Sequence, residues 1–456
     1  MIDSELFEMP TVHPMNYDTN FDEMIVSGAL GCFEEESSYK LMNDLKLLAQ
    51  DVRNKKMDGV LSRSAGMGHG SVLDQAYFVY SIENLPRAAT LQLCQPEFLA
   101  HEQQSLRRAK ATRGFYIPPK IVESKLFKET KSILSDSFAL YEKMASEGVP
   151  GEDARYILPL YTKTNIQTAG DIRELQHLHA MNEQGEVPSI VQETVNRMVD
   201  EGKKWAPTAF QNRGKNYEML AWRPSAQIYA KENYTINKLI RKNGIPDNPC
   251  LVSNTKFMMN ESAIQKAIKW RDEAELSNFK HIHFNFLVPM SYASFHQSIR
   301  QRTWNHSVES IYDSATWGFT VVPPSIGSSK FLDRYNEAAT GMIRLYKDLV
   351  EDGVPRSEAI GVMPHSLRMY DFIHIDGWNA IHSLGKRTCV TAQWEIRNIA
   401  NEVAREIRKV SPVLGKYIGR QCKTYGYCPE EKDEWRQDFN KSPCEFYSAH
   451  KGKFSK

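Results

Sequence analysis

The chain repeats itself at a spacing of 205 residues, and this repeat limits the folds that it can adopt. Gln92 and Gln297 are the first pair related in this way. The same spacing relates His101 to His306, Ser105 to Ser310, Gly148-Val149-Pro150 to Gly353-Val354-Pro355, Pro159 to Pro364, Asp171 to Asp376 and His177 to His382. At 456 residues the chain is also longer than one hydrophobic core usually grows. The sequence therefore predicts two copies of one domain.

We place the first copy at residues 1–215 and the second at residues 216–430, with a polar tail at residues 431–456. Apolar and polar residues alternate at 78–82 and again at 284–288, which predicts one strand in each copy. We therefore expect β-structure in both copies.

Helical spacing of apolar residues appears near the end of each copy, and we interpret these positions as core rather than ligand contacts. The residues are Ile190, Val191, Thr194, Val195 and Met198 in the first copy, and Ile396, Ile399, Ala400, Val403 and Ile407 in the second. Between the copies, Arg241 to Asn254 contains Asn-Gly, Ile-Pro and Asn-Pro pairs, which predict a loop.

The charge balance of the chain argues against polyanionic partners. Its 57 Lys and Arg residues oppose 56 Asp and Glu residues, so no overall field attracts nucleic acid or an anionic membrane. The first ten residues, MIDSELFEMP, lack the basic and apolar stretches of a secretory signal. We therefore expect a cytoplasmic protein that acts on small molecules.

Seven irregularly spaced cysteines do not suggest a disulfide framework, so we expect reduced thiols. Cys422, Cys428, Cys444 and His450 gather near the end of the chain. Their spacing is not a standard zinc pattern, and we predict no metal site.

Guanidinium groups gather in the second copy, where Gln297 is followed by Arg300, Gln301 and Arg302. Two arginines around one residue can grip a phosphate or a planar imide, although a solvated basic turn has the same pattern. The first copy lacks these arginines. It has instead Ser105 and Arg107, a hydroxyl and a cation that could bind a phosphate.

The two copies complement each other at further positions. Arg155 of the first copy corresponds to Ile360 in the second, whereas Arg387 of the second corresponds to Asn182 in the first. Gly68-His69-Gly70-Ser71 occurs only in the first copy, and on its own it indicates a turn far more often than a binding loop. Each copy has thus kept a different part of the polar set.

These motifs resemble the flavin-dependent thymidylate synthase family. Its Arg-His-Arg-x-x-Ser-x-Asn-Glu-x-Ser-x-Arg-Tyr pattern is represented by Arg300-Gln301-Arg302 with Ser310, and by Ser105-Leu106-Arg107. Its other motifs are similar to Gly68 to Ser71, Ala154 to Pro159, Asp171 to Leu175 and Ala392 to Ile396. The resemblance implies an α+β fold present as two tandem copies, a pseudo-dimer in one chain.

The resemblance also implies roles for single residues. Arg387 and Arg300 would be catalytic, and Gln297, Ser105, Arg107, Arg155 and Ser310 would bind the substrate. FAD contacts would fall on His69, Ser71, Arg173, Arg300, Gln301, Arg302, His177 and His382. In such a site the phosphate of a nucleotide lies near Arg155 and the base near Arg387.

The implied reaction is the reductive methylation of dUMP, with methylene-tetrahydrofolate supplying the carbon and NADPH reducing the FAD. The family works as a homotetramer, so we expect a homodimer of this chain that forms a pseudo-tetramer with two working sites. Gln301 and Thr391 replace family histidines, which leaves hydroxymethylation or another pyrimidine open as an alternative. A non-catalytic protein that binds nucleotide or flavin is the other alternative.

Overall fold

A computed structural model describes residues 6, 8–14, 20–211, 222–255, 261–270 and 272–425. Over these residues the chain forms two compact units, each assembled from separate stretches of sequence. The first unit contains the chain up to Phe138, Leu158–Lys231 and Gly341–Met363. The second contains Ala139–Ile157, Glu232–Thr340 and the chain from Pro364 onward.

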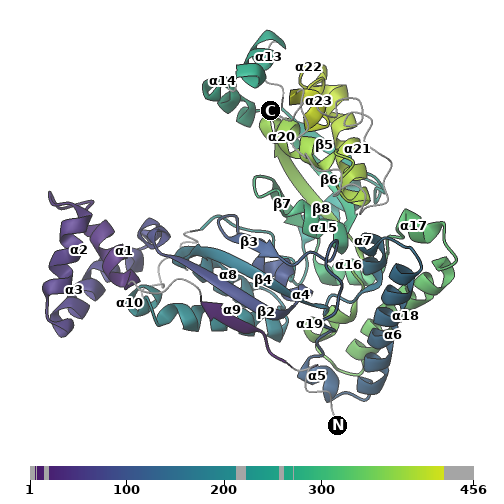
Figure 1. Cartoon of the computed structure of the whole chain (residues 1–456), viewed down its shortest axis with the longest axis horizontal. Helices are drawn as coiled ribbons and strands as arrows, with labels where there is room; N and C mark the ends of the chain where they lie inside the picture. The colour runs from purple at the N-terminus through teal and green to yellow at the C-terminus, as the bar shows by residue number, and fades with distance from the viewer. Residues whose placement is uncertain are drawn as a thin grey trace. The chain divides into compact units, whose positions relative to one another are not determined.

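The first unit is built on a four-stranded antiparallel sheet of order β1-β2-β4-β3 (Figure 1). Its strands are β1 (Thr11–Pro14), β2 (Tyr77–Pro86), β3 (Ala100–Gln103) and β4 (Lys163–Asp171). Along β2, Phe78, Tyr80 and Ile82 are buried and alternate with more exposed neighbours. The strand predicted there is confirmed.

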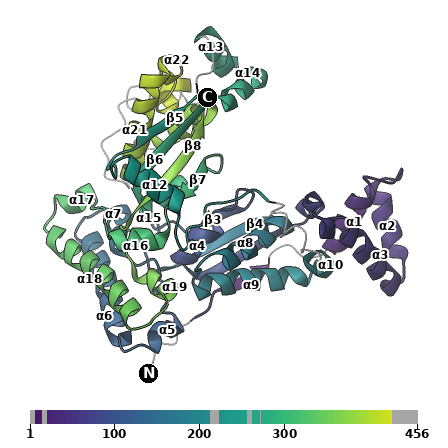
Figure 2. The same ribbon diagram turned by 180° about the vertical axis from the view of Figure 1, so that it is seen from behind.

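Helices α8 and α9 pack on this sheet (Figure 2), and the Tyr80 hydroxyl donates to the Met198 carbonyl of α9 at 2.9 Å. The apolar stripe predicted for α9 is buried as expected. Helices of the first unit are α1 (Phe21–Leu30), α2 (Ser38–Leu47), α3 (Gln50–Arg63), η2 (Ala65–Met67), η3 (Gly70–Gln75), α4 (Arg87–Leu93), α5 (Pro119–Val122), α8 (Ile172–Gln184), α9 (Ser189–Lys203), α10 (Pro207–Gln211), α19 (Arg356–Ala359) and η6 (Ile360–Val362).

The second unit repeats the sheet, with order β5-β6-β8-β7. Its strands are β5 (Cys250–Asn254), β6 (His283–Ser291), β7 (Asn305–Val308) and β8 (Arg368–Asp376). The strand predicted at 284–288 is confirmed, but the loop predicted at 241–254 is wrong at both ends, because Arg241 and Lys242 still belong to helix α12 (Tyr234–Lys242) and a strand begins at Cys250. The turn residues stop at Pro249, and the short apolar stretch after them pairs with β6 as β5.

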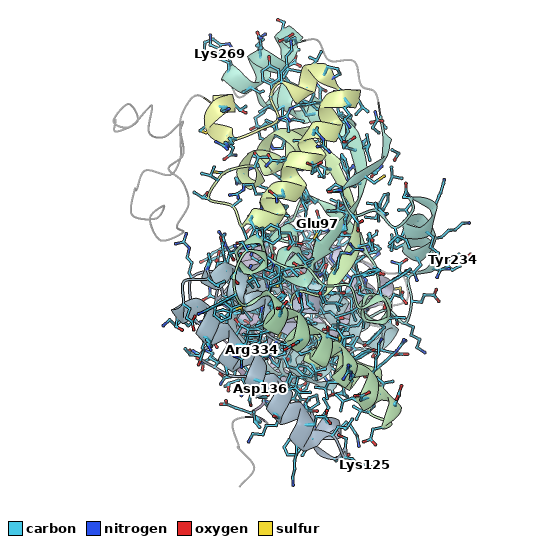
Figure 3. All side chains as sticks on the ribbon, turned by 90° about the vertical axis from the view of Figure 1, so that its right-hand side faces the viewer. Glu97, Lys125, Asp136, Tyr234, Lys269 and Arg334 are labelled. Carbon is cyan, nitrogen blue, oxygen red and sulfur yellow. The ribbon has the colours of Figure 1, made fainter. Side chains whose placement is uncertain are left out.

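Helices α20 and α21 pack on the second sheet, and α12 places Ile236 and Ile240 against Leu287 and Tyr370. Tyr234 at the start of α12 projects into solvent (Figure 3). Helices of this unit are α7 (Gly151–Ala154), η4 (Arg155–Ile157), α12 (Tyr234–Lys242), α13 (Glu261–Trp270), α14 (Glu273–Asn278), η5 (Phe279–His281), α15 (Tyr292–Ser298), α16 (Ile311–Trp317), α17 (Pro324–Gly327), α20 (Gly377–Arg387), α21 (Trp394–Val410), α22 (Pro412–Gly415) and α23 (Gln421–Tyr425).

The elements of the two units recur at the spacing read from the sequence. Strands β3 and β4 correspond residue for residue to β7 and β8, and helix α6 (Phe127–Ser146) corresponds to α18 (Leu332–Glu351). Both helices end in the same turn, where Gly148 and Gly353 take φ values of 95° and 90°. Only glycine adopts this conformation without strain, which explains the repeated Gly-Val-Pro. The α+β fold in two copies is confirmed.

Each unit includes a segment that the repeat assigns to the other copy. In the first unit, the Tyr161 hydroxyl donates to the Glu358 carbonyl at 2.7 Å, and Ser189 donates through N and Oγ to the Glu358 carboxylate at 2.8 and 3.0 Å. Gly361 lies so close to Tyr161 that an added Cβ would sit 2.2 Å from the ring. The segment Gly341–Met363 is therefore closely packed into the first unit.

Replacing Gly361 with alanine tests this packing. The new methyl group must displace a buried aromatic ring, so we expect the free energy of unfolding to fall by about 1–3 kcal/mol. Gly341→Ala is the matched control, because it lies within helix α18 with no atom near its Cβ position. There alanine should stabilise the protein by up to about 1 kcal/mol. Denaturant unfolding measures both, and equal effects would contradict the packing described.

Candidate active site

A buried carboxylate organises one end of the second unit. Glu395, in the first turn of α21, accepts hydrogen bonds from Ser291 N at 2.7 Å, Ser291 Oγ at 2.5 Å and the Tyr156 hydroxyl at 2.6 Å. Burial raises the pKa of Glu395, while these hydrogen bonds and the charge of Arg155 oppose the rise. The Gln393 amide donates to Tyr156 at 2.7 Å and caps α21.

The position of Arg155 is fixed by this cluster because Arg155 directly precedes Tyr156 in the chain. It is 2% exposed, and its Nε donates to the Glu152 carbonyl at 3.1 Å. The neighbouring Asp153 accepts from Ser325 at 2.6 Å. A guanidinium from the first copy of the sequence therefore lies in the second unit.

Arg387, at the end of α20, is held by Gln301. When the Gln301 amide is oriented by its neighbours, its oxygen accepts from Arg387 Nε at 2.8 Å and Nη2 at 2.5 Å. The same loop is tied to the start of α20, where Thr303 donates to Asn379 at 2.6 Å. Gln301 thus orients the guanidinium that the sequence singles out as catalytic.

Gln297 and its counterpart Gln92 differ in their hydrogen bonding. In the first unit, Gln92 donates to Asn182 at 2.7 Å, and Asn182 occupies the position that corresponds to Arg387. In the second unit, Gln297 is 5% exposed. Gln92 Oε1, Asn182 Nδ2 and Gln297 Oε1 are all buried without a hydrogen-bond partner among the described residues, so both units have open hydrogen-bonding groups here.

The other predicted residues of the second unit are spread over several settings. Arg300 and Arg302 are exposed on the loop after α15. The ring of His382 stacks on Trp378 at 5.4 Å, and burial lowers its pKa. Ser310 is buried and caps α16 through a hydrogen bond from Tyr312 N at 3.2 Å, a structural role that its sequence motif did not indicate.

In the first unit, Ser105 and Arg107 form a turn in which Ser105 Oγ accepts from Arg107 N at 3.3 Å. Both side chains are partly exposed. They lie in the unit that does not contain Arg155.

The loop with His69 and Ser71 is linked to α8 in the first unit. Arg173 of α8 donates to Asp74 of η3 at 2.5 Å, while burial raises the pKa of Asp74. Further along α8, His177 is buried with its ring stacked on Trp222 at 5.3 Å. His69, Ser71, Arg173 and His177 thus belong to one region of this unit.

Helix α8 also carries buried polar atoms without hydrogen-bond partners in the described part of the chain. Both amide atoms of Gln176 are of this kind, while the Oε2 atom of Glu174 lies 3.5 Å from His177 Nδ1. Buried polar groups normally pair. The region therefore has unused hydrogen-bonding capacity that fits a polar ligand such as a flavin.

Glu309 is a buried carboxyl group that the sequence did not single out. Burial raises its pKa from the usual 4.5 to about 7, although its Oε2 accepts from Ser314 Oγ at 3.0 Å and Tyr370 N at 3.1 Å. The sequence signal that could have identified Glu309 was a carboxylate directly before Ser310, the residue that caps α16.

Among the described residues, no three His, Cys, Asp or Glu side chains are placed to hold a metal ion. The described cysteines are thiols (Cys32, Cys94, Cys250, Cys389 and Cys422). Cys428, Cys444, His450 and the predicted tail lie outside the described residues. None of the described helices combines the length and apolar character needed to cross a membrane.

Two equivalent sheet-and-helix halves, each carrying part of a polar site, define an α+β protein of a recognisable class. The sequence model of the family described as thymidylate synthase complementing protein, Thy1, matches residues 15–208 and 235–413. The chain belongs to this family, as its ordered motifs predicted. Its curated relatives are enzymes.

Three relatives illustrate the similarity, and each is named flavin-dependent thymidylate synthase. The one from Pyrococcus furiosus is 35% identical over 26% of this chain and 52% of its own length. That from Pyrococcus abyssi is 30% identical over 38% and 70%, and that from Geobacter sulfurreducens is 34% identical over 34% and 68%. The chain thus spans about half the length of the first relative and about two thirds of the others.

Solved structures are more distant. The UMP/dUMP methylase PolB from Streptomyces cacaoi, bound with 5-Br dUMP, is 14% identical with a TM-score of 0.37, over 45% of this chain and 95% of that one. This similarity is too low to carry a functional argument.

Glu309→Gln should change how stability depends on pH. Between pH 4.5 and about 7 the folded protein keeps the Glu309 proton while the unfolded chain has released it, so the wild type loses stability as pH rises through this window. The variant lacks this loss and should gain about 1–3 kcal/mol relative to the wild type between pH 5 and pH 8. Thermal unfolding at several pH values measures it.

Glu351→Gln, an exposed carboxylate at the end of α18, is the control and should follow the wild-type profile. Parallel profiles for the wild type and Glu309→Gln would contradict the raised pKa of Glu309.

Proposed function

We propose that the protein is a flavin-dependent thymidylate synthase that methylates dUMP to dTMP with methylene-tetrahydrofolate and NADPH. The observation that carries this proposal is that two arginines from different copies lie in one unit. Arg155 and Arg387 belong to the unit of Gln297, whereas the other unit has Ile360 and Asn182 at the corresponding positions, where Gln92 donates to Asn182. This contrast supports one working and one inactive combination.

The working site is composite in this proposal. Arg155 would grip the phosphate of the nucleotide together with Ser105 and Arg107, and Gln297 would pair with the base. Support comes from Arg155 and Gln297 lying in one unit although they come from different copies. A bidentate guanidinium suits phosphate better than an ammonium does.

Arg387 is the group proposed to act on the base. A guanidinium against the uracil imide stabilises negative charge that spreads over the ring, which makes C5 more nucleophilic. Gln301 holds two N–H groups of Arg387, so the cation is oriented before substrate binds. Because a guanidinium only donates, it favours the carbonyl of uracil over the exocyclic amine of cytosine. Arg300 would assist.

His69, Ser71, Arg173 and His177 of the first unit would hold the flavin, together with Arg300, Gln301, Arg302 and His382. The unpaired polar atoms of α8 fit such a group. When bound, FAD reduced by NADPH would supply the hydride that completes the methyl group. The protein residues bind, orient and polarise.

We further propose that two chains associate as a homodimer that forms a pseudo-tetramer with two working sites. Arg155 is replaced by Ile360 in the second copy, and Arg387 is replaced by Asn182 in the first. Each chain therefore retains one arginine at each of the two positions, which is enough for one complete site per chain and supports a count of two per homodimer. A cytoplasmic location stays a prediction.

The test is to incubate the purified protein with FAD, NADPH, methylene-tetrahydrofolate and dUMP, and to weigh the nucleotide product by mass spectrometry. We expect a product heavier by one methylene group. Arg387→Ala should lower kcat by about 100-fold or more, because one preorganised donor is lost from the reacting ring.

Lys386→Ala is the matched control, since it removes an exposed cation beside Arg387 and should leave turnover at the wild-type rate. A product heavier by a hydroxymethylene would replace the proposal with its closest alternative. A protein that binds flavin and nucleotide but forms no product would contradict catalysis and leave a binding protein.

A further inference from the structure

A separate basic pocket lies at the end of the second unit. Its volume is about 790 Å³, and its walls come from the residue after α20, from the later part of α21, from α22 and from the segment that leads into α23. One wall residue, Thr388, directly follows Arg387 in the chain. No residue assigned to the proposed active site lines this pocket.

The pocket is lined by four cationic side chains, Arg408, Lys416, Arg420 and Lys423, and by no Asp or Glu of the described chain. Lys416 is paired with Glu261 at 2.8 Å on the surface. Arg420 and Lys423 have neither an ion pair nor a side-chain hydrogen bond with any described residue. Arg420 and Lys423, which have no anionic partner in the described part of the chain, give this concave wall a local positive potential.

The shape of the pocket is fixed by Arg408. Its Nε and Nη2 donate to the carbonyls of Gly415 at 3.3 Å and Ile418 at 2.5 Å. A Cβ at Gly415 would lie 2.6 Å from the Arg408 side chain, so only glycine permits this approach. The segment after α21 is therefore folded back on the Arg408 guanidinium, which fixes the backbone of this wall of the pocket.

Apolar surface lies beside the charges. Tyr417 and Ile418 line the same pocket, next in sequence to Lys416. A planar ring beside phosphate-binding cations is the arrangement that suits a nucleotide, and the volume falls in the range of small-ligand sites. Arg420 and Lys423, the two cations engaged neither by backbone carbonyls nor by Glu261, match phosphate oxygens by charge and geometry.

We propose that this pocket binds the phosphate groups of a nucleotide at a site distinct from that of dUMP. Two sources share this chemistry: the reductant NADPH of the proposed reaction, and a nucleoside polyphosphate that acts as an effector. Only the first source rests on the proposed function.

The direct test is calorimetric titration of the full chain with inorganic pyrophosphate at low salt, in the presence of saturating dUMP. The wild type should bind, and Arg420→Ala/Lys423→Ala should weaken binding by about tenfold or more. Arg344→Ala/Lys347→Ala on α18 is the matched control, with the same residue types at the same spacing on an exposed surface, and should bind as the wild type does.

Failure of the wild type to bind, or equal weakening by the two double variants, would overturn the proposal. Arg420→Gln/Lys423→Gln repeats the test with side chains that keep hydrogen-bonding groups, and it should show the same loss. Binding of pyrophosphate does not depend on turnover. An inactive protein would therefore refute the proposed function but would leave the proposed phosphate site unaffected.

Competition against pyrophosphate separates the sources. If NADPH is the ligand, it competes more strongly than NADH, and Arg420→Ala/Lys423→Ala raises KM for NADPH but not for dUMP. If an effector is the ligand, ATP competes and KM for NADPH is unchanged. If no nucleotide displaces pyrophosphate, the proposal of a nucleotide site is wrong.

Discussion

The candidate site depends on the hydrogen bond that the buried carboxylate of Glu395 accepts from Tyr156. Tyr156 comes from the first copy of the sequence and Glu395 from the second, and their 2.6 Å hydrogen bond lies inside one compact unit. Leaving a buried hydrogen-bonding group unsatisfied costs about 1–3 kcal/mol, so this contact favours one position of η4. Arg155, the preceding residue, is thereby fixed in the unit of Arg387. Arg155, assigned to the phosphate, and Arg387, assigned to the base, thus lie in one unit because Tyr156 donates a hydrogen bond to Glu395.

The first unit contains the corresponding segment of the second copy, Gly341–Met363, and there the residues at the equivalent positions are different. In the first unit, Glu358 binds the first turn of α9 through Ser189, and Ile360 is buried where the second unit has Arg155. Gln92 and Asn182 pair with each other. Gln92 Oε1 and Asn182 Nδ2 in this half, like Gln297 Oε1 in the other, lack hydrogen-bond partners among the described residues. The two halves therefore differ in charge at these positions, because one has two guanidinium groups where the other has an isoleucine and an asparagine.

Much of the fold was predictable because the repeat and the apolar periodicity are local signals. The strands at 78–82 and 284–288 and the buried stripes of α9 and α21 follow from spacing alone. Strand β5 was missed because its pairing with β6 is a long-range contact beside strong turn residues. Motif order identified Arg155, Gln297 and Arg387, but the exchange of Ala139–Ile157 and the hydrogen bond between Gln301 and Arg387 depend on tertiary packing. The pKa of Glu309 likewise reflects burial, which the sequence does not give.

The most direct measurement is the number of nucleotides bound per chain. Calorimetric titration of the flavin-loaded protein with dUMP should saturate at one equivalent per chain, because only the combination with Arg155, Gln297 and Arg387 has both arginines. Saturation at two equivalents per chain would mean that the half with Ile360 and Asn182 also binds substrate, and it would contradict the division into one working and one inactive site.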